Sequence, residues 1–565
     1  MSSVINFKYK NAFWALILIF LASCSRDKFA EMNTDPDAVL TIDPEKELTP
    51  GQLSMVNSDF EAFYDYVRNI NPWVQVYVNT NGNSATFMET GGNINNRWGI
   101  FYGGVGYNLS DVIHLVDIMP DDEKAQYQQL RAIAGVSKAY YAFYVADANG
   151  SIPYSQAFQA RYTIPALLTP AYDTQEALFD TLDAQLKAYA AVLKATPGVA
   201  QKGLNTNDIY YQGNATNWYK AANSLRLRIA MRLMKRNPTK LTSIANEVIN
   251  DGLISSIDEE WILNAGPGVG NGGDRNPVNQ ANYSGEINTV DFMWKAQDPR
   301  ARVFYQQSGI ASQAMFDSAK AQGKIPASMT WDGQLIRGQF ADPNADQNPA
   351  NAAYFGLLNF SFNGIAKSVY LSSIIQPRLT YPAYNGGAGT TVFPLITYAD
   401  VCLMRAELVV RGLSNDPESA EDLYKQGITA SITDYDKWAK VTQIDGYTAL
   451  GSDEIANYLE QPGVAYDEAN ALEQICVQQY LNFFMQPNEN WSLLKRTGLP
   501  GASGVIMPLE DVSAFGEMPR RYPVTYPSQA DLNFTNITNA IDQMRSDPDF
   551  GEPTSLYGRV WWDKK

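Results

Sequence analysis

The sequence predicts a mainly α-helical protein whose helices frame one long, loop-rich middle part. Apolar residues recur at spacings of three and four over 124–145, with Leu130 and Ile133 among them, and again over 217–236. Since a helix has 3.6 residues per turn, this spacing places the side chains on one helical face. Residues 261–396, by contrast, are rich in Gly, Asn, Pro and aromatic residues without such a period. We therefore expect a helical scaffold that carries an irregular binding segment.

Composition excludes several functional classes. The 565 residues are 45% hydrophobic, 12% aromatic and 18% charged, which is typical of a globular chain rather than a disordered one. The net charge of -17 repels phosphate backbones, so the sequence predicts no nucleic-acid partner. His114 is the single histidine, which excludes a multi-histidine metal site. Apolar neighbours on a predicted helix favour a packed role for His114 over a catalytic one.

Residues 1–23 have the pattern of a secretory signal peptide. Two lysines precede an apolar run from Ala12 to Ala22, which is too short to span a bilayer. The run ends in LASC (21–24), which resembles a bacterial lipobox, so Cys24 is predicted to be the lipidated first residue of the mature chain. The polar, proline-containing stretch 24–50 is predicted to be a lipidated tether.

Further amphipathic segments extend the helical prediction along the chain. They are 107–119, 175–194, 241–250, 397–412, 418–434 and 469–485. Short turns join several of them, so helix hairpins are expected. No strict repeat is visible, although helix pairs of this length are compatible with degenerate tetratricopeptide-like units. Cys402 and Cys476 lie in apolar helical segments and are predicted to be buried, without thiol chemistry.

Nine segments spread over the chain resemble one known family. The first five are NTDPDAV (33–39), DANGSIPYSQAF (147–158), PAYDTQEALFDTLDAQL (170–186), WYKAANSLRLRIAMRL (218–233) and DPRAR (298–302). The C-terminal half contributes PLITYADVCLMRAEL (394–408), YKQGITASI (424–432), LEQICVQQYLNFFMQPNENWSLLKRTGLP (472–500) and PRRYPVTYPSQADLN (519–533). Together they resemble the SusD/RagB family of outer-membrane nutrient-binding lipoproteins, in its SusD-like_2 branch. Asp400, where the family usually has Glu, and Leu494-Lys495-Arg496, in place of a more common Arg-Arg pair, are mild departures.

The resemblance implies tetratricopeptide-like helix pairs packed against an irregular, loop-rich ligand-binding part. The expected single body spans 51–565, with the scaffold mainly in 105–250 and 397–500 and the binding part mainly in 71–102 and 261–396. The resemblance also implies a protein that is lipid-anchored on the exterior face of the outer membrane. It would bind an oligosaccharide or a peptide, without catalysis or cofactor, and pass it to a SusC-like TonB-dependent transporter.

The residue types of 71–102 suit a carbohydrate ligand. Aromatic rings stack on the C–H faces of a pyranose, while amide and guanidinium groups pair with its hydroxyls. The predicted ligand-binding residues in this cluster are Trp73, Tyr77, Asn79, Asn81, Arg97 and Trp98. Tyr283 and Trp294, near DPRAR, form a second predicted group. A core position is the alternative for Trp98, since large aromatic residues usually bury, and Asp298 and Arg300 could pair locally.

Asp342, Asn344, Asp346 and Asn348 alternate along one stretch, a spacing that lets side-chain oxygens converge on calcium. The EF-hand pattern is incomplete, because Gln347 and Ala353 stand where it requires glycine and glutamate, and this favours a plain polar loop.

Two alternative functions remain open. A surface glycoside hydrolase would need two carboxylates about 5 to 10 Å apart. A helical-repeat scaffold would bind only protein.

Overall fold

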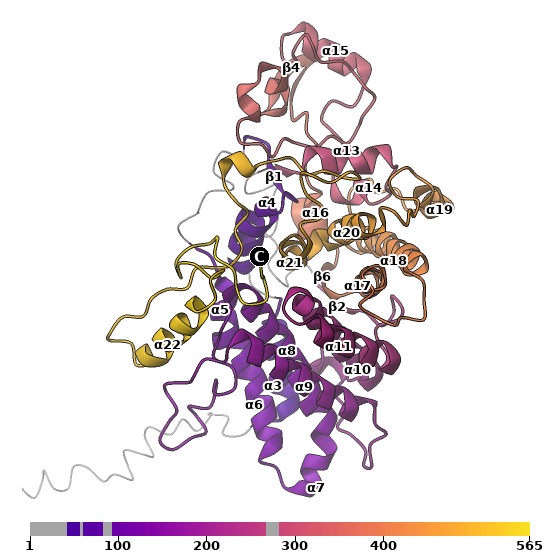
Figure 1. Ribbon diagram of the computed structural model, residues 1–565. Helices are drawn as coiled ribbons and strands as arrows, with labels where there is room; N and C mark the ends of the chain where they lie inside the picture. Colours follow the sequence, from indigo (N-terminus) through magenta and orange to yellow (C-terminus); the bar gives the residue numbers. More distant parts are fainter. Residues whose placement is uncertain (1–41, 57–59, 83–92, 267–281) are drawn as a thin grey trace, which may run out of the picture.

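The computed structural model describes residues 42–56, 60–82, 93–266 and 282–565. About 51% of the structure is helical and strands are few, which confirms the predicted mainly α fold class (Figure 1). The signal peptide, Cys24 and most of the tether fall outside the described residues. Within them, no helix is both long and apolar enough to cross a bilayer.

The N-terminal helices pack one after another in the lower part of Figure 1. They are α3 (Pro44–Leu53), α6 (Gly106–Asp117), α8 (Gln128–Asn149), α9 (Gln175–Lys194), α10 (Ala215–Met231) and α11 (Pro238–Asp251). Side-chain caps fix the starts of two of these helices. At α9, the Thr174 side chain accepts a hydrogen bond from the Ala177 amide. At α11, the Asn237 side chain accepts one from the Lys240 amide, and Pro238 is the first helical residue. The predicted bounds 175–194 coincide with α9.

A second helical group comes from the C-terminal half. It comprises α17 (Tyr398–Val410), α18 (Ala420–Val441), α20 (Ala471–Asn482), α21 (Pro487–Thr497) and α22 (Phe534–Arg545). Thr397 and Asp400 form a capping box that fixes the start of α17. Cys402 and Cys476 are buried and unpaired in disulfides, as predicted, and burial raises the pKa of each thiol to about 12.

The middle of the chain holds more regular structure than the sequence predicts. It contains β2 (Trp261–Ala265), β3 (Tyr283–Ser284), α13 (Ile287–Lys295), α14 (Ala301–Phe304), α15 (Gln313–Ala321), β4 (Leu358–Phe362), β5 (Ile365–Val369), α16 (Pro377–Thr380) and β6 (Thr391–Ile396). The pairs β2–β6 and β4–β5 are antiparallel. Elements of nine residues or fewer span too few helical or strand periods to stand out in the sequence.

The remaining elements are short. The helices are α4 (Asn71–Trp73), α5 (Asn96–Ile100), α7 (Asp121–Lys124) and α19 (Glu454–Leu459), with π-helical turns η1 (Glu61–Ile70) and η2 (Phe101–Val105). The 3₁₀ turns are η3 (Ala125–Tyr127), η4 (Asn205–Asn207), η5 (Arg232–Lys235), η6 (Ala345–Gln347), η7 (Pro349–Tyr354), η8 (Tyr384–Gly386), η9 (Phe483–Met485) and η10 (Ser513–Phe515). Strand β1 (Val78–Asn79) pairs with β3, so the two predicted binding segments, 71–102 and 261–396, meet there.

Buried arginines connect the two helical groups. Arg228 of α10 and Arg232 of the following turn η5 lie off the apolar stripe of 217–236 in the sequence, yet both are buried. Arg232 contacts Asp147 of α8 at 3.0 Å and Glu489 of α21 at 2.9 Å, and Arg228 contacts Asp400 of α17 at 2.6 Å. These charges are therefore held inside the protein by partners from three other helices.

The end of the chain closes over the first helices. The indole of buried Trp562 donates to the Asp147 carbonyl oxygen at 3.0 Å, and the Trp562 amide donates to Gln175 at 3.1 Å. Asp563, also buried, pairs with Arg520 and Arg559. The C-terminal residues thus complete the core made by α8 and α9.

Candidate functional site

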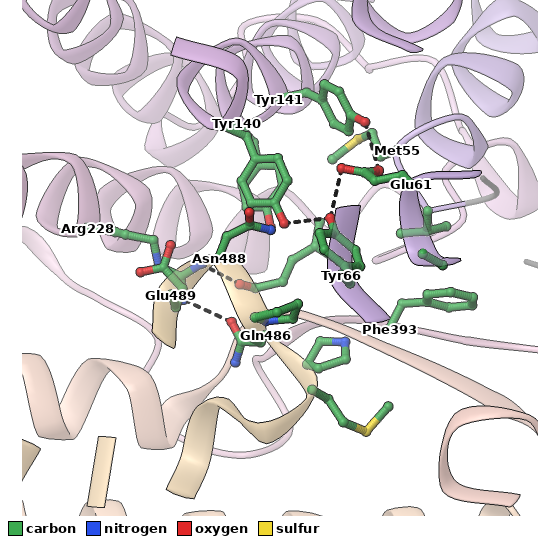
Figure 2. A pocket seen from close by; sticks show the side chains of 17 residues that line it. Met55, Glu61, Tyr66, Tyr140, Tyr141, Arg228, Phe393, Gln486, Asn488 and Glu489 are labelled. Carbon is green, nitrogen blue, oxygen red and sulfur yellow. Dashed lines mark hydrogen bonds and ion pairs between the residues drawn. The ribbon is translucent and has the colours of Figure 1, made fainter. Parts of the chain in front are cut away.

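A small polar cleft lies where η1, α8, β6 and the start of α21 meet (Figure 2). Its labelled lining includes Glu61, Tyr66, Tyr140, Tyr141, Arg228, Gln486, Asn488 and Glu489. The cavity measures about 70 Å³, enough for a few water molecules or one polar group. Drug-sized ligands occupy roughly 300–1,000 Å³, so an oligosaccharide has to bind mainly outside this cleft.

Glu61 is the centre of the cleft's hydrogen-bond network. Its carboxylate accepts from the Tyr66 hydroxyl at 2.8 Å and the Tyr141 hydroxyl at 3.1 Å, and the three side chains point toward one another in Figure 2. The Tyr66 and Tyr144 hydroxyls are 2.7 Å apart. Burial raises the pKa of Glu61 to about 7, against the opposing effect of the Arg97 charge.

Replacement of Glu61 by glutamine is expected to remove part of the pH dependence of stability. Because the folded-state pKa lies above the unfolded value, the folded state binds the extra proton, and stability falls as pH rises from about 4.5 to about 7. The wild-type loss over this window is about 3 kcal/mol. Chemical denaturation from pH 4.5 to 8 should therefore show a flatter curve for Glu61→Gln.

Glu552→Gln is the matched control for this measurement, because Glu552 is an exposed carboxyl. It should reproduce the wild-type pH curve. Parallel curves for wild type and Glu61→Gln would contradict the buried-proton interpretation of the cleft.

Arg97 is buried behind the cleft, and its predicted contact with the ligand stays a prediction. Its guanidinium donates to the Asn488 side chain at 2.5 Å, the Tyr522 hydroxyl at 3.1 Å and the Tyr144 carbonyl oxygen at 3.3 Å. It also lies 4.4 Å from the centroid of the Tyr144 ring. Arg97 thus ties α5 to α8 and α21 and holds the cleft walls together.

The outer side of η1 carries an aromatic platform made of Phe60, Phe63 and Tyr64. Phe60 is 57% exposed, more than any other aromatic side chain that the structure describes. The Tyr64 ring lies 5.7 Å from Phe60 and 4.9 Å from Phe63, and the Arg68 guanidinium is 5.4 Å from the Phe63 ring. Neighbouring residues of the same turn, Glu61 and Tyr66, face the cleft. π-Helical turns occur frequently at functional sites.

The sequence analysis missed this platform, although a signal was present. Four aromatic residues fall within the seven positions FEAFYDY (60–66), just before the segment chosen as the binding cluster. The α-helical period does not sort these residues into those of the platform and those of the cleft, because the turn is π-helical rather than α-helical.

Trp73, Tyr77 and Tyr283 are brought close to the β1–β3 pair, and all three are buried. Tyr77 lies 5.8 Å from Tyr283 and 5.8 Å from Phe484, and Trp73 lies 5.5 Å from Trp491. Ligand contact by these three residues stays a prediction. Asn79 is half-buried in β1, and Asn81 is exposed beside it.

Trp98 and Trp294 lie apart from this group, and both are half-buried. The Trp98 ring is 4.9 Å from Tyr102 and 6.5 Å from Tyr172, against the N-terminal core. Trp294, on α13, packs against the other large core. Their roles as ligand contacts stay predictions.

The neighbouring DPRAR segment (298–302) makes its side-chain contacts inside the protein. Asp298 and Arg300 form a buried pair at 2.7 Å, and Arg300 also reaches Gln478 at 2.7 Å and Ser431 at 3.0 Å. His114, the single histidine, is half-buried and stacks on Tyr162 with ring centroids 3.6 Å apart.

At the predicted calcium loop, the Asp342 side chain accepts a hydrogen bond from the Asn344 amide at 2.8 Å, which closes a local turn. Asp346 is exposed. No group of three or more His, Cys, Asp or Glu side chains with metal-binding geometry occurs in the part of the chain that the structure describes. Calcium binding by Asp342, Asn344 and Asp346 stays a prediction.

Comparison with known proteins decides the family. The family model SusD-like_2, described as starch-binding and associating with the outer membrane, matches residues 36–527. The chain belongs to the SusD-like_2 family. SusD-like proteins are binding proteins rather than enzymes, and the family is associated with the outer membrane. No curated protein matches the sequence.

Solved structures show the same SusD-like fold. A chitin-binding protein superimposes with a TM-score of 0.68 at 21% identity, covering 93% of this chain and 100% of that one. A chitin-binding SusD homologue from Flavobacterium johnsoniae gives a TM-score of 0.64 at 18% identity, covering 92% and 99%. A SusD homologue from Bacteroides fragilis gives 0.62 at 23% identity, covering 93% and 100%.

Proposed function

We propose that this SusD-like protein is a cell-surface lipoprotein that captures an oligosaccharide and passes it to a SusC-like TonB-dependent transporter. In this proposal Cys24 carries the lipid that anchors the chain to the outer membrane. The observation that carries it is the aromatic platform of exposed Phe60 and half-buried Phe63 and Tyr64, which lies next to Glu61 and Tyr66 of the cleft. Two similar structures, named as chitin-binding proteins, support a glycan as the ligand class.

The chemistry of the platform fits a sugar ring. Aromatic faces bind the C–H faces of pyranoses, and exposed aromatic side chains remain solvated until a ligand covers them. Arg68 at the platform and Asn81, which is exposed two residues after β1, supply donors for hydroxyl groups. The 70 Å³ cleft behind the platform has room for a water molecule or one substituent of the ligand, not for a ring.

Phe60→Ala is expected to weaken oligosaccharide binding at least about tenfold. Covering one large aromatic side chain is worth about 1.5–3 kcal/mol, and 1.4 kcal/mol corresponds to a factor of ten in affinity. Calorimetric titration of the mature chain against chitin, starch and cellulose fragments, and against a peptide panel, measures the effect. Phe60 is exposed, so its removal should leave the unfolding midpoint unchanged.

Tyr526→Ala is the matched control, since Tyr526 is an aromatic residue that is 49% exposed at a different part of the chain. It should bind like the wild type. Equal affinities for Phe60→Ala and wild type would remove the platform from the site. Saturable binding of peptides alone would change the ligand class, and release of shortened sugars would favour the glycoside hydrolase alternative.

A further inference from the structure

Three highly exposed apolar side chains gather at one corner of the molecule. Ile164 is fully exposed, Leu532 is 77% exposed and Leu168 is 59% exposed. Pro165 and Ala166, between the first and third of these, are exposed as well. Single exposed apolar residues are ordinary on a protein surface, but a cluster of them marks a surface that another apolar phase covers.

Hydrogen bonds hold the two parts of this corner together. Asn533 donates to the Pro170 carbonyl oxygen at 2.9 Å, and Asn536 of α22 donates to the Thr169 carbonyl oxygen at 3.0 Å. Leu532 and Leu168 each stand one residue from these contacts, so the two exposed residues lie on segments that run side by side. In Figure 1, α22 lies at the left edge of the molecule. We call Ile164, Leu168 and Leu532 the apolar corner.

The apolar corner lies close to the helix at which the described chain begins. Arg161, three residues before Ile164, pairs with Asp111 of α6. The charges of Asp111 and Arg161 both act on Glu47 of α3, so Arg161 lies near that helix. Three residues span at most about 10 Å, which limits the distance from Arg161 to Ile164.

The predicted tether is short enough to keep this corner at the membrane. Cys24 precedes Pro44 by 20 residues, and a chain of that length spans at most about 70 Å. A lipid on Cys24 therefore holds the α3 side of the body, and with it the apolar corner, within reach of the bilayer surface.

We propose that the apolar corner inserts into the outer leaflet of the membrane to which the Cys24 lipid anchors the chain. This inference rests on the lipid anchor of the proposed function. Apolar side chains that protrude from a loop and from the start of a helix can enter the interfacial region of a bilayer while the backbone stays outside it. The corner then acts as a second contact that fixes the orientation of the body on its membrane.

The test uses the full lipidated chain in vesicles of phosphatidylethanolamine and phosphatidylglycerol. An environment-sensitive fluorophore is attached to a cysteine placed at one position at a time, in Ile164→Cys, Leu168→Cys and Leu532→Cys. Cys402 and Cys476 are buried, so they do not compete for the label. Val505→Cys is the matched control, because Val505 is 79% exposed but lies outside the corner.

The expected result is a blue shift of emission and a loss of intensity with brominated acyl chains at the three corner positions, but not at position 505. Flotation of the vesicles reads the anchor separately. Flotation without a blue shift would overturn membrane insertion and leave the anchor intact, whereas failure to float would overturn both. A blue shift that arises only after a transporter is added would also overturn the proposal and assign the corner to a protein partner.

Discussion

Replacement of Arg232 by leucine is expected to lower the free energy of unfolding by about 3–5 kcal/mol, because it removes the nearest cation from two buried carboxylates. Burial alone would raise the pKa of Asp147, yet Arg232 and Lys495 hold it below its usual value. Arg232 likewise keeps the pKa of Glu489 low despite burial. Both acids are therefore ionised at neutral pH, and leucine would leave them charged in the core.

Chemical denaturation followed by tryptophan fluorescence measures this loss. Arg545→Leu is the matched control, since Arg545 pairs with Glu552 at 3.3 Å on the exposed surface, where ion pairs contribute about 0–1 kcal/mol. Similar losses for the two variants would show that the buried ion pairs of Arg232 are not what joins η5 to α8 and α21.

Trp218→Ala should destabilise the N-terminal core by about 3–5 kcal/mol through the cavity that it opens. The Trp218 indole is buried, lies 5.1 Å from Trp261 and 5.2 Å from Tyr211, and donates to Asp208 at 2.7 Å. Its removal therefore costs packing on α10, β2 and the loop before α10 at once. The midpoint of thermal or urea unfolding measures the effect.

Trp218→Phe separates packing from hydrogen bonding. Phenylalanine refills part of the space, while Asp208 keeps its bonds from Gln52 and the Gly213 amide, so we expect a clearly smaller loss than for alanine. Equal losses for the two variants would assign the stabilisation to the indole hydrogen bond instead.

Long helices were predictable because each carries several turns of amphipathic pattern, as in α9. The burial of Arg228 in α10 and of Arg232 in η5 was not predictable, since both stand off the apolar stripe of 217–236. Their burial depends on partners distant in sequence: Asp147 is 85 positions from Arg232, and Glu489 is 257 positions from it. A local pattern contains no information about such pairing.

In the candidate site, too, contacts between residues distant in the sequence decide which side chains are buried. Trp73 and Tyr77 have the residue types of a sugar platform, but Trp491 and Phe484, more than 400 positions away in the chain, cover them. Phe60 has no such cover and stays exposed. Residue type thus predicts the ligand chemistry, while tertiary contacts decide which aromatic rings a ligand can reach.

The position of Trp562 makes the packing of the first helices depend on residues distant in the chain. Its indole and its amide bond to Asp147 of α8 and to Gln175 of α9, which lie 415 and 387 positions away. Contacts of such large sequence separation form slowly, because the loop between the partners has to close before they are made. We therefore expect α8 and α9 to form as helices early in refolding and to reach their final packing in a later, slower step.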